Sequence, residues 1–139
     1  MRRQASAILV LLGFSAAAVA ACSNNDSTGT GGSTDLSGNY SLVAFTENDT
    51  TIGPPIATGT LALTSSVYHL VLNIDIPEPD DTTMEVDSGT YTTKGDSIYE
   101  HSTTGSLPDA LGTFRVAGDT LHINVTEQTL SIQSVWHKN

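Results

Sequence analysis

The chain contains an internal repeat of ten residues that align without a gap: residues 89–98 read GTYTTKGDSI and residues 112–121 read GTFRVAGDTL. In each copy, two short stretches with alternating side chains flank a Gly-Asp pair, which is the pattern of a β-hairpin. The turn glycines, Gly95 and Gly118, supply the positive φ that tight hairpin turns require. The repeat therefore predicts two antiparallel hairpins in this part of the chain.

Residues 36–139 as a whole have this β-type pattern. Apolar residues alternate with polar ones, threonine and β-branched residues are frequent, and Gly or Pro breaks recur at short intervals, with hardly any helical periodicity. We predict strands at residues 38–46, 59–64, 67–75, 82–93, 97–103, 112–117, 120–126 and 129–138. The short turns between most of them predict an all-β domain, a small antiparallel eight-stranded meander barrel. The two longer connections, residues 47–57 and 77–81, are expected to build its mouth.

The long strand predicted at residues 82–93 contains a change of side-chain direction. Met84 and Val86 point one way and Tyr91 the other, so we expect a β-bulge or a sharp coil near Ser88 and Gly89. Small barrels need corners of this kind in order to close.

The second copy of the repeat predicts an apolar interior face. The alternating residues that share this face are Phe114, Val116, Leu121, Ile123 and Val125. The matching positions of the first copy are Tyr91, Thr93, Ile98, Glu100 and Ser102. Half of the first hairpin is therefore polar where the second is apolar.

Glu100 is the most unusual member of this face, because a buried carboxylate costs several kcal/mol unless it is paired or hydrogen-bonded. Two interpretations remain open. Glu100 lies in water near the open end of the barrel, or it faces a cavity and contacts a ligand. On the second interpretation, Tyr91, Tyr99 and Glu100 are the candidate ligand-binding residues.

The N-terminal residues have the three parts of a secretory signal peptide. Arg2 and Arg3 form a positive leader, residues 7–14 are almost wholly apolar, and residues 15–21 are rich in small side chains. The apolar stretch is too short to span a bilayer, which takes roughly 20 apolar residues. We therefore predict that residues 1–21 are removed.

Residues 22–35 separate this leader from the predicted barrel. After Cys22 they read SNNDSTGTGGSTD and contain no apolar residue, so they cannot contribute to a core. This composition predicts a flexible, disordered tether. The chain is thus divided into a leader (1–21), a tether (22–35) and one barrel domain (36–139).

The single cysteine, Cys22, follows Val19-Ala20-Ala21, and this segment resembles the lipobox of bacterial lipoproteins. The resemblance implies cleavage after Ala21, a diacylglyceryl group on the Cys22 thiol, and a further acyl chain, such as palmitate, on the amine. Several acyl chains on one residue anchor a protein stably, because each buried CH2 contributes about 0.8 kcal/mol. The implied location is the bacterial cell envelope, and Ser23 after the cysteine implies the outer membrane.

The charge of the chain argues against one class of partner. There are 15 acidic residues against 5 Lys and Arg, a formal net charge of -10, and removing residues 1–21 takes away Arg2 and Arg3, so that -10 becomes -12. Such a surface repels phosphate backbones, so we predict no nucleic-acid binding. Lipidation of the only cysteine also leaves no thiol for a disulfide, a thiolate metal site or cysteine catalysis.

Three short motifs in residues 36–138 look like the lipocalin-like domain of small bacterial lipoproteins. They are LSGNYSL at residues 36–42, the two Gly-Thr-aromatic hairpins, and VWHK at residues 135–138. In most lipocalins the first strand carries Gly-x-Trp, and the Trp packs against a basic residue of the last strand. Tyr40 stands in the Trp position here, and the resemblance implies Lys138 or Arg115 as its basic partner. A calycin-type barrel of eight strands holds one small ligand or is filled by side chains.

Other classes of site have little support in the sequence. The four histidines show no ligand spacing along a strand, and alternation sends His101 and His122 outward, so we predict no metal and no cofactor. No serine lies in a Gly-x-Ser-x-Gly elbow, and Asp75 and Glu85 are the nearby candidates for a second inward acid beside Glu100. We predict no enzymatic activity.

Two functions are therefore expected, beside a third possibility, structural packing in the cell envelope without a discrete ligand. In the first, a cell-envelope lipoprotein binds a small, partly apolar molecule inside a lipocalin-like barrel. In the second, the barrel is filled, and it acts as a protein-interaction or inhibitor module through its loops at residues 47–57 and 77–81.

Overall fold

The computed structural model describes residues 34–76, 81–104, 107–127 and 130–139. The strands of these residues are β1 (Gly38–Glu47), β2 (Thr50–Ile52), β3 (Ala57–Leu63), β4 (Val67–Ile76), β5 (Asp81–Lys94), β6 (Ser97–Ser102), β7 (Ala110–Ala117), β8 (Thr120–Glu127) and β9 (Leu130–Lys138). The predicted signal peptide, Cys22, most of the predicted tether and residues 77–80 lie outside the described residues. Within the described residues, no helix is long and apolar enough to cross a membrane.

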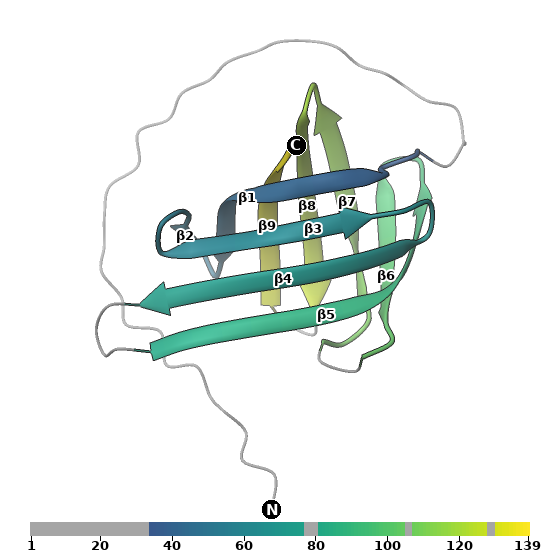
Figure 1. Cartoon of the computed structure of the whole chain (residues 1–139). Coiled ribbons are helices and arrows are strands. Elements are labelled where there is room, and N and C mark those ends of the chain that lie inside the picture. The colour runs from purple at the N-terminus through teal and green to yellow at the C-terminus, as the bar shows by residue number, and fades with distance from the viewer. Residues whose placement is uncertain (1–33, 77–80, 105–106, 128–129) are drawn as a thin grey trace, which may run out of the picture.

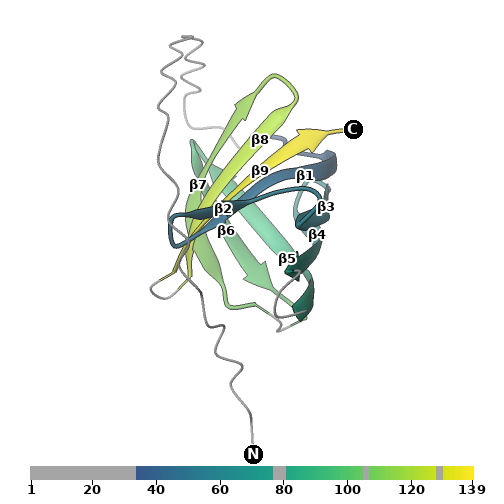
Figure 2. The same ribbon diagram turned by 90° about the vertical axis from the view of Figure 1, so that its left-hand side faces the viewer.

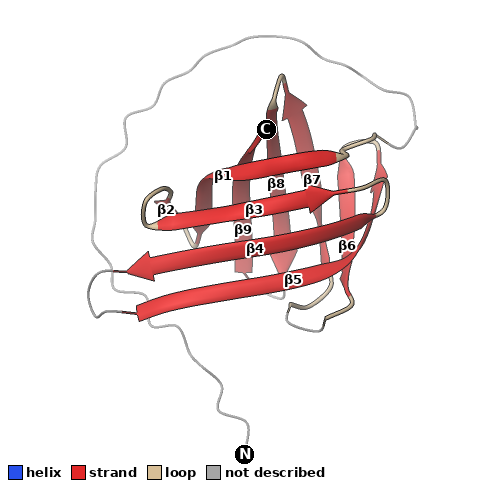
Figure 3. Cartoon of the chain, in the orientation of Figure 1, coloured by secondary structure: helices blue, strands red, loops and turns tan. Residues whose placement is uncertain are grey.

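The strands form a closed antiparallel barrel. From β3 to β9 each strand pairs with the next, β3 also pairs with β1, and β1 pairs with β9, so the sheet closes on itself. Eight strands form the wall, while the short β2 pairs with the end of β1. Figures 1 and 3 show this all-strand fold, and Figure 2 shows β9 beside β1, where the sheet closes. The predicted eight-stranded meander barrel is confirmed, and it is consistent with a lipocalin-like fold.

β5 forms a corner of the barrel (Figure 1). Its residues 81–90 pair with β4 and its residues 89–94 pair with β6, and neither ladder shows a register shift. The strand therefore turns the corner near Ser88 and Gly89 as a continuous strand: the predicted β-bulge is wrong, and the alternative prediction, a sharp coil of the strand, agrees with the structure. Met84 and Val86 lie on the outer surface and Tyr91 faces the interior, as plain alternation along one continuous strand requires.

Glycines allow neighbouring strands to approach closely at this corner. A Cβ atom at Gly89 would lie 2.1 Å from the carbonyl oxygen of His101 and 2.7 Å from a ring carbon of Tyr68. At Gly112, the equivalent position of the second hairpin, a Cβ would lie 2.0 Å from the carbonyl oxygen of Asn124. The repeat thus places a glycine at two close contacts between strand backbones.

An apolar core fills much of the barrel interior. Its buried members are Leu36, Tyr40, Leu42, Ala57, Leu61, Leu63, Tyr68, Leu72, Tyr91, Ile98, Ala110, Phe114, Leu121, Ile123, Val125 and Trp136. Four of the five core residues predicted in the second hairpin are among them. The fifth, Val116, is 50% exposed, although its pair partner Leu121 is fully buried.

The two ends of the barrel differ. The turns β3–β4, β5–β6 and β7–β8 lie at one end, which we call the base. Leu36 and Tyr40 are buried there, and the Tyr40 hydroxyl donates to the carbonyl of Leu36 at 2.7 Å. The other end, which we call the loop end, carries the connections after β1, β4, β6 and β8. Because strand direction alternates in a meander, the two long connections predicted to build the mouth share this end.

Candidate functional site

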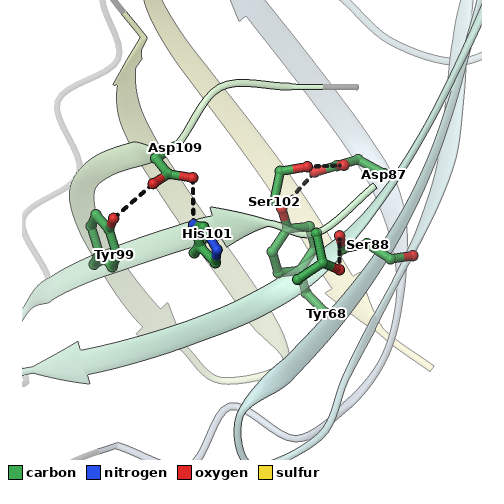
Figure 4. Close-up of polar contacts among 8 residues, drawn as sticks. Tyr68, Asp87, Ser88, Tyr99, His101, Ser102 and Asp109 are labelled. Carbon is green, nitrogen blue, oxygen red and sulfur yellow. Dashed lines mark hydrogen bonds and ion pairs between the residues drawn. The ribbon is translucent and has the colours of Figure 1, made fainter. Parts of the chain in front are cut away.

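A buried carboxylate occupies the interior wall where β5 turns the corner. Asp87 is 1% exposed and is the one charged residue among those described as fully buried. It accepts hydrogen bonds from Tyr68 Oη at 2.5 Å and Ser102 Oγ at 2.6 Å, and a short one from Thr104 Oγ1. Figure 4 shows Tyr68 and Ser102 beside Asp87. The three hydroxyls come from β4, β6 and the residues that follow β6, so the Asp87 cluster joins three segments.

The electrostatics of this cluster keep Asp87 ionised. Burial acts to raise the pKa of Asp87, but the hydrogen bonds from Ser102, Thr104 and Tyr68 outweigh it and hold the pKa below its usual value. Burial and the hydrogen bond to Asp87 raise the pKa of the Tyr68 hydroxyl, which therefore remains a donor. The negative charge is compensated by hydroxyl donors, so this carboxylate is suited to holding structure together.

Two further carboxylates share the inner wall. Glu85 pairs with Leu72 and Glu100 pairs with Tyr91 and Ala110, which places both on the inward face, and both are half-buried. Burial, and then the charge of Asp87, raise the pKa of Glu85. Of the two residues predicted as a second inward-facing acid beside Glu100, Glu85 is the one that faces the barrel interior.

Asp75, the other candidate, is exposed and accepts a hydrogen bond from Thr82 at 3.0 Å. It lies on the outer face of β4, because inward-facing Leu72 and outward-facing Asp75 differ by an odd number of positions along the strand.

The three predicted ligand-binding residues do not come together in one pocket. Tyr91 is 3% exposed in the core, and its hydroxyl donates to the carbonyl of Thr64 at 2.5 Å. Glu100 lies on the same inner wall, as alternation predicts. Tyr99 lies on the outer face and is 43% exposed, because it precedes an inward residue in β6.

Tyr99 instead belongs to a polar group on the outer surface (Figure 4). Its hydroxyl donates to Asp109 Oδ2 at 2.9 Å, while His101 Nδ1 lies 2.7 Å from Asp109 Oδ1. These contacts hold the pKa of Asp109 below and that of Tyr99 above its usual value. With Thr104 bonded to Asp87, the β6–β7 connection is fastened at both of its ends.

Two hollows lie outside the inner wall around Asp87. One, of about 290 Å³, is lined largely by outward-facing side chains of β7, β8 and β9, among them Arg115 and His122. The other, of about 340 Å³, lies at the base between the first described residues and Thr93. Neither includes Glu85, Asp87 or Glu100.

The resemblance to lipocalins implied a basic partner for Tyr40, and the structure supplies one. Lys138 Nζ lies 5.8 Å from the centre of the Tyr40 ring and donates to the carbonyl of Ser37 at 2.8 Å. Tyr40 and Lys138 are directly paired across β1 and β9. Arg115, the other predicted candidate, lies on the outer face, 3.5 Å from His122.

Sequence reasoning missed Asp87 and two of its donors, Tyr68 and Thr104, whereas it placed the third donor, Ser102, on the interior face. The available signal was alternation: Asp87 lies four positions before Tyr91 and so faces the same side of a continuous strand. Because a bulge was expected near Ser88 and Gly89, alternation was not continued from Tyr91 back to Asp87. As for metals, no cluster of three His, Cys, Asp or Glu with ligand geometry occurs in the part of the chain that the structure describes.

A comparison with protein-family models finds no match for this chain, and a comparison with curated proteins finds no similar sequence. The functional assignment therefore depends on the residues and geometry described above.

Proposed function

We propose that the chain is a lipid-anchored protein of the bacterial cell envelope whose lipocalin-like barrel is a filled scaffold that binds a protein partner at its loop end. The observation that carries the proposal is the composition of the interior. Sixteen apolar residues are buried there. The buried acid is satisfied by three hydroxyl donors, and the Tyr91 hydroxyl is bonded to Thr64.

The position of Thr34, the first residue that the structure describes, supports the same proposal. Thr34 exchanges hydrogen bonds with Thr93, of 3.2 and 3.3 Å, next to the β5–β6 turn at the base. An acyl anchor at Cys22 would join the barrel at this end. The loop end is then the part of the barrel farthest from the attachment point, where a partner has free access.

The lipocalin-like assignment draws support from the Tyr40–Lys138 contact and from the closed meander. Both features were expected from the resemblance, and neither depends on a bound ligand. We therefore regard the barrel as a calycin-type scaffold.

Changing Cys22 to Ser is expected to abolish lipidation, because only the cysteine thiol can receive the diacylglyceryl group. Growth of expressing bacteria with radiolabelled palmitate should label the wild-type chain and leave the variant at background. Ser27→Ala, in the same predicted tether, is the control and should keep full labelling. Persistent labelling of the Cys22 variant would refute the anchoring proposal.

Partner binding is expected at the loop end and not at the base. A photoreactive amino acid replaces Thr50, an exposed residue of β2, or Asp119, an exposed residue of the β7–β8 turn. Irradiation of intact cells should crosslink the Thr50 variant to an envelope protein at least tenfold more than the Asp119 variant. Equal crosslinking from both positions would contradict the proposal.

A small, partly apolar ligand remains the second candidate function, because Glu85 and Glu100 face inward and are only half-buried. Native mass spectrometry of the protein purified from cells separates the two functions. The filled scaffold predicts the bare protein mass. A reproducible extra mass that is lost on denaturation, and that falls in Glu100→Gln, would favour the small ligand instead.

A further inference from the structure

The first half of β5 is a sheet edge. Residues 81–90 pair with β4, but β6 pairs with β5 only from residue 89 onward. Among the described residues, no strand pairs with residues 82–87 on the side away from β4. Figure 1 shows this half of β5 as the lower border of the layer formed by β1, β3, β4 and β5.

The contacts of Ser88 show which backbone groups face this edge. Its carbonyl accepts the N–H of Thr103 at 2.9 Å, and its N–H donates to Thr104 Oγ1 at 3.3 Å. Both groups of Ser88 therefore point away from β4. Because these directions alternate along an antiparallel strand, the N–H and C=O groups of Thr82, Met84 and Val86 point the same way.

The edge thus has hydrogen-bonding groups aligned for an added strand. At Ser88 the place of an added strand is already taken by Thr103 and Thr104, which follow β6 and bond to the edge-facing groups of Ser88. An extended segment placed beside residues 82–86 would continue the line of that pairing.

The two faces of this edge differ in chemistry. On the outer face Met84 is 66% exposed and Val86 is 37% exposed. On the inner face lies the half-buried carboxylate of Glu85, whose burial and proximity to Asp87 disfavour its charge. An added strand would meet apolar side chains on one face and the carboxyl group of Glu85 on the other, in alternation, and a cationic side chain opposite Glu85 would favour its ionised form.

A second copy of the chain does not fit this edge. Acidic residues occur at positions 81, 85 and 87 of the segment DTTMEVD. Every antiparallel register that brings the edge-facing groups of two copies together over at least five residues sets an acid directly opposite an acid. Like charges in directly opposed positions destabilise a sheet, and inward-facing charges are a known protection of edges against self-pairing.

We propose that the edge of β5 at residues 82–86 binds an extended segment of a partner protein by β-strand addition, and that this segment places apolar side chains beside Met84 and Val86 and a lysine or arginine opposite Glu85. The backbone groups of the edge supply the hydrogen bonds. The alternation of apolar Met84 and Val86 with acidic Glu85 selects a partner segment that alternates apolar and basic side chains. The net charge of -10 favours the approach of such a basic segment. The inference deepens the proposed function and rests on it only in requiring a protein partner.

The test uses the full chain with Cys22→Ser and the peptide acetyl-Thr-Val-Lys-Val-Lys-Val-Thr-amide, which alternates apolar and basic side chains. Amide hydrogen exchange is followed by NMR. At saturating peptide, the amides of Thr82, Met84 and Val86 should exchange at least tenfold more slowly. The amides of Thr83 and Glu85 should change little, because they already face β4. A peptide with Glu in place of Lys is the control and should give no protection.

Three variants test what the edge-facing N–H and the Glu85 side chain each contribute to peptide binding. Met84→Pro removes an edge-facing N–H and should weaken peptide binding at least tenfold, whereas Met84→Thr keeps the N–H and should weaken it much less. Glu85→Lys should reverse the preference, so that the Glu peptide binds better than the Lys peptide.

Protection at other amides, equal binding by Met84→Pro and Met84→Thr, or a dimer that buries the same amides without peptide would overturn the inference. In that case, persistent crosslinking from Thr50 would show that the proposed function survives without it.

Discussion

Replacement of Asp87 by Ala is expected to lower the free energy of unfolding by about 3–5 kcal/mol. The substitution removes the acceptor shared by Tyr68, Ser102 and Thr104 and leaves their hydroxyl groups without their buried partner. It also removes the bond from Thr104 to Asp87, so the start of the β6–β7 connection is held to β5 only by its hydrogen bonds with Ser88. Urea denaturation followed by the fluorescence of Trp136, the single tryptophan, measures the change.

Asp75→Ala is the matched control for this substitution. Asp75 is an exposed acid of the neighbouring strand whose side chain accepts a hydrogen bond from the Thr82 hydroxyl, and loss of this side chain should cost about 0.5 kcal/mol. A loss of stability in Asp87→Ala no greater than in this control would show that the Asp87 cluster does not stabilise the corner.

The pH dependence of stability provides a second check of the same cluster. The pKa of Asp87 is lower in the folded than in the unfolded chain, so its contribution is present above the unfolded pKa and is lost as pH falls through the folded one. Glu85 has the opposite sign, because its pKa is raised on folding and acidification relieves its cost. The stability advantage of the wild type over Asp87→Asn that comes from the Asp87 charge should therefore shrink below about pH 4.

Replacement of Gly89 by Ala is expected to destabilise the barrel by about 3 kcal/mol or more. The added methyl group would lie 2.1 Å from a carbonyl oxygen of β6 and 2.7 Å from the Tyr68 ring. Backbone atoms of a paired strand cannot move aside without breaking the ladder, and displacement of Tyr68 also disturbs Asp87. Gly112→Ala should have a similar effect, since its methyl group would lie 2.0 Å from the carbonyl oxygen of Asn124. Urea denaturation measures both changes.

The turn glycine of the first hairpin is the control for these substitutions. Gly95 has a φ of +63°, and a Cβ there would meet no atom within 4 Å. Its replacement by Ala costs only the left-handed backbone conformation, about 1 kcal/mol. If Gly89→Ala and Gly95→Ala were equally destabilising, close strand approach at the corner would not be the reason for the glycine.

Local pattern was sufficient for the eight strands of the barrel wall and for most of the core, but it missed β2, which lies within the predicted connection at residues 47–57. Hairpin turns depend on residues adjacent in sequence, and alternation assigns the two faces of any one strand, so the interior residues of β7 and β8 could be predicted. The resemblance to lipocalins implied Lys138 or Arg115 as the basic partner of the Tyr40 ring. The pairing of β1 with β9 places Lys138 there.

The direction of β5 was not decided by local pattern. The segment DTTMEVD has apolar Met84 and Val86 on one face and acidic Glu85 and Asp87 on the other, so its composition favours burial of the wrong face. The ladders with β4 and β6 fix Tyr91 inward without a register shift, and Asp87 must then face inward as well.

The sequence by itself thus determined the β-strand pattern and the meander, because hairpin turns and alternation depend on near neighbours, whereas the pairing of β1 with β9 that closes the barrel joins residues far apart in sequence. The tertiary structure alone decided the burial of Asp87, the outward position of Tyr99 and the open edge of β5. A carboxylate is stable in the interior only where hydroxyl donors from β4, β6 and the following residues converge. That convergence arises when the barrel closes, not from any local stretch of sequence.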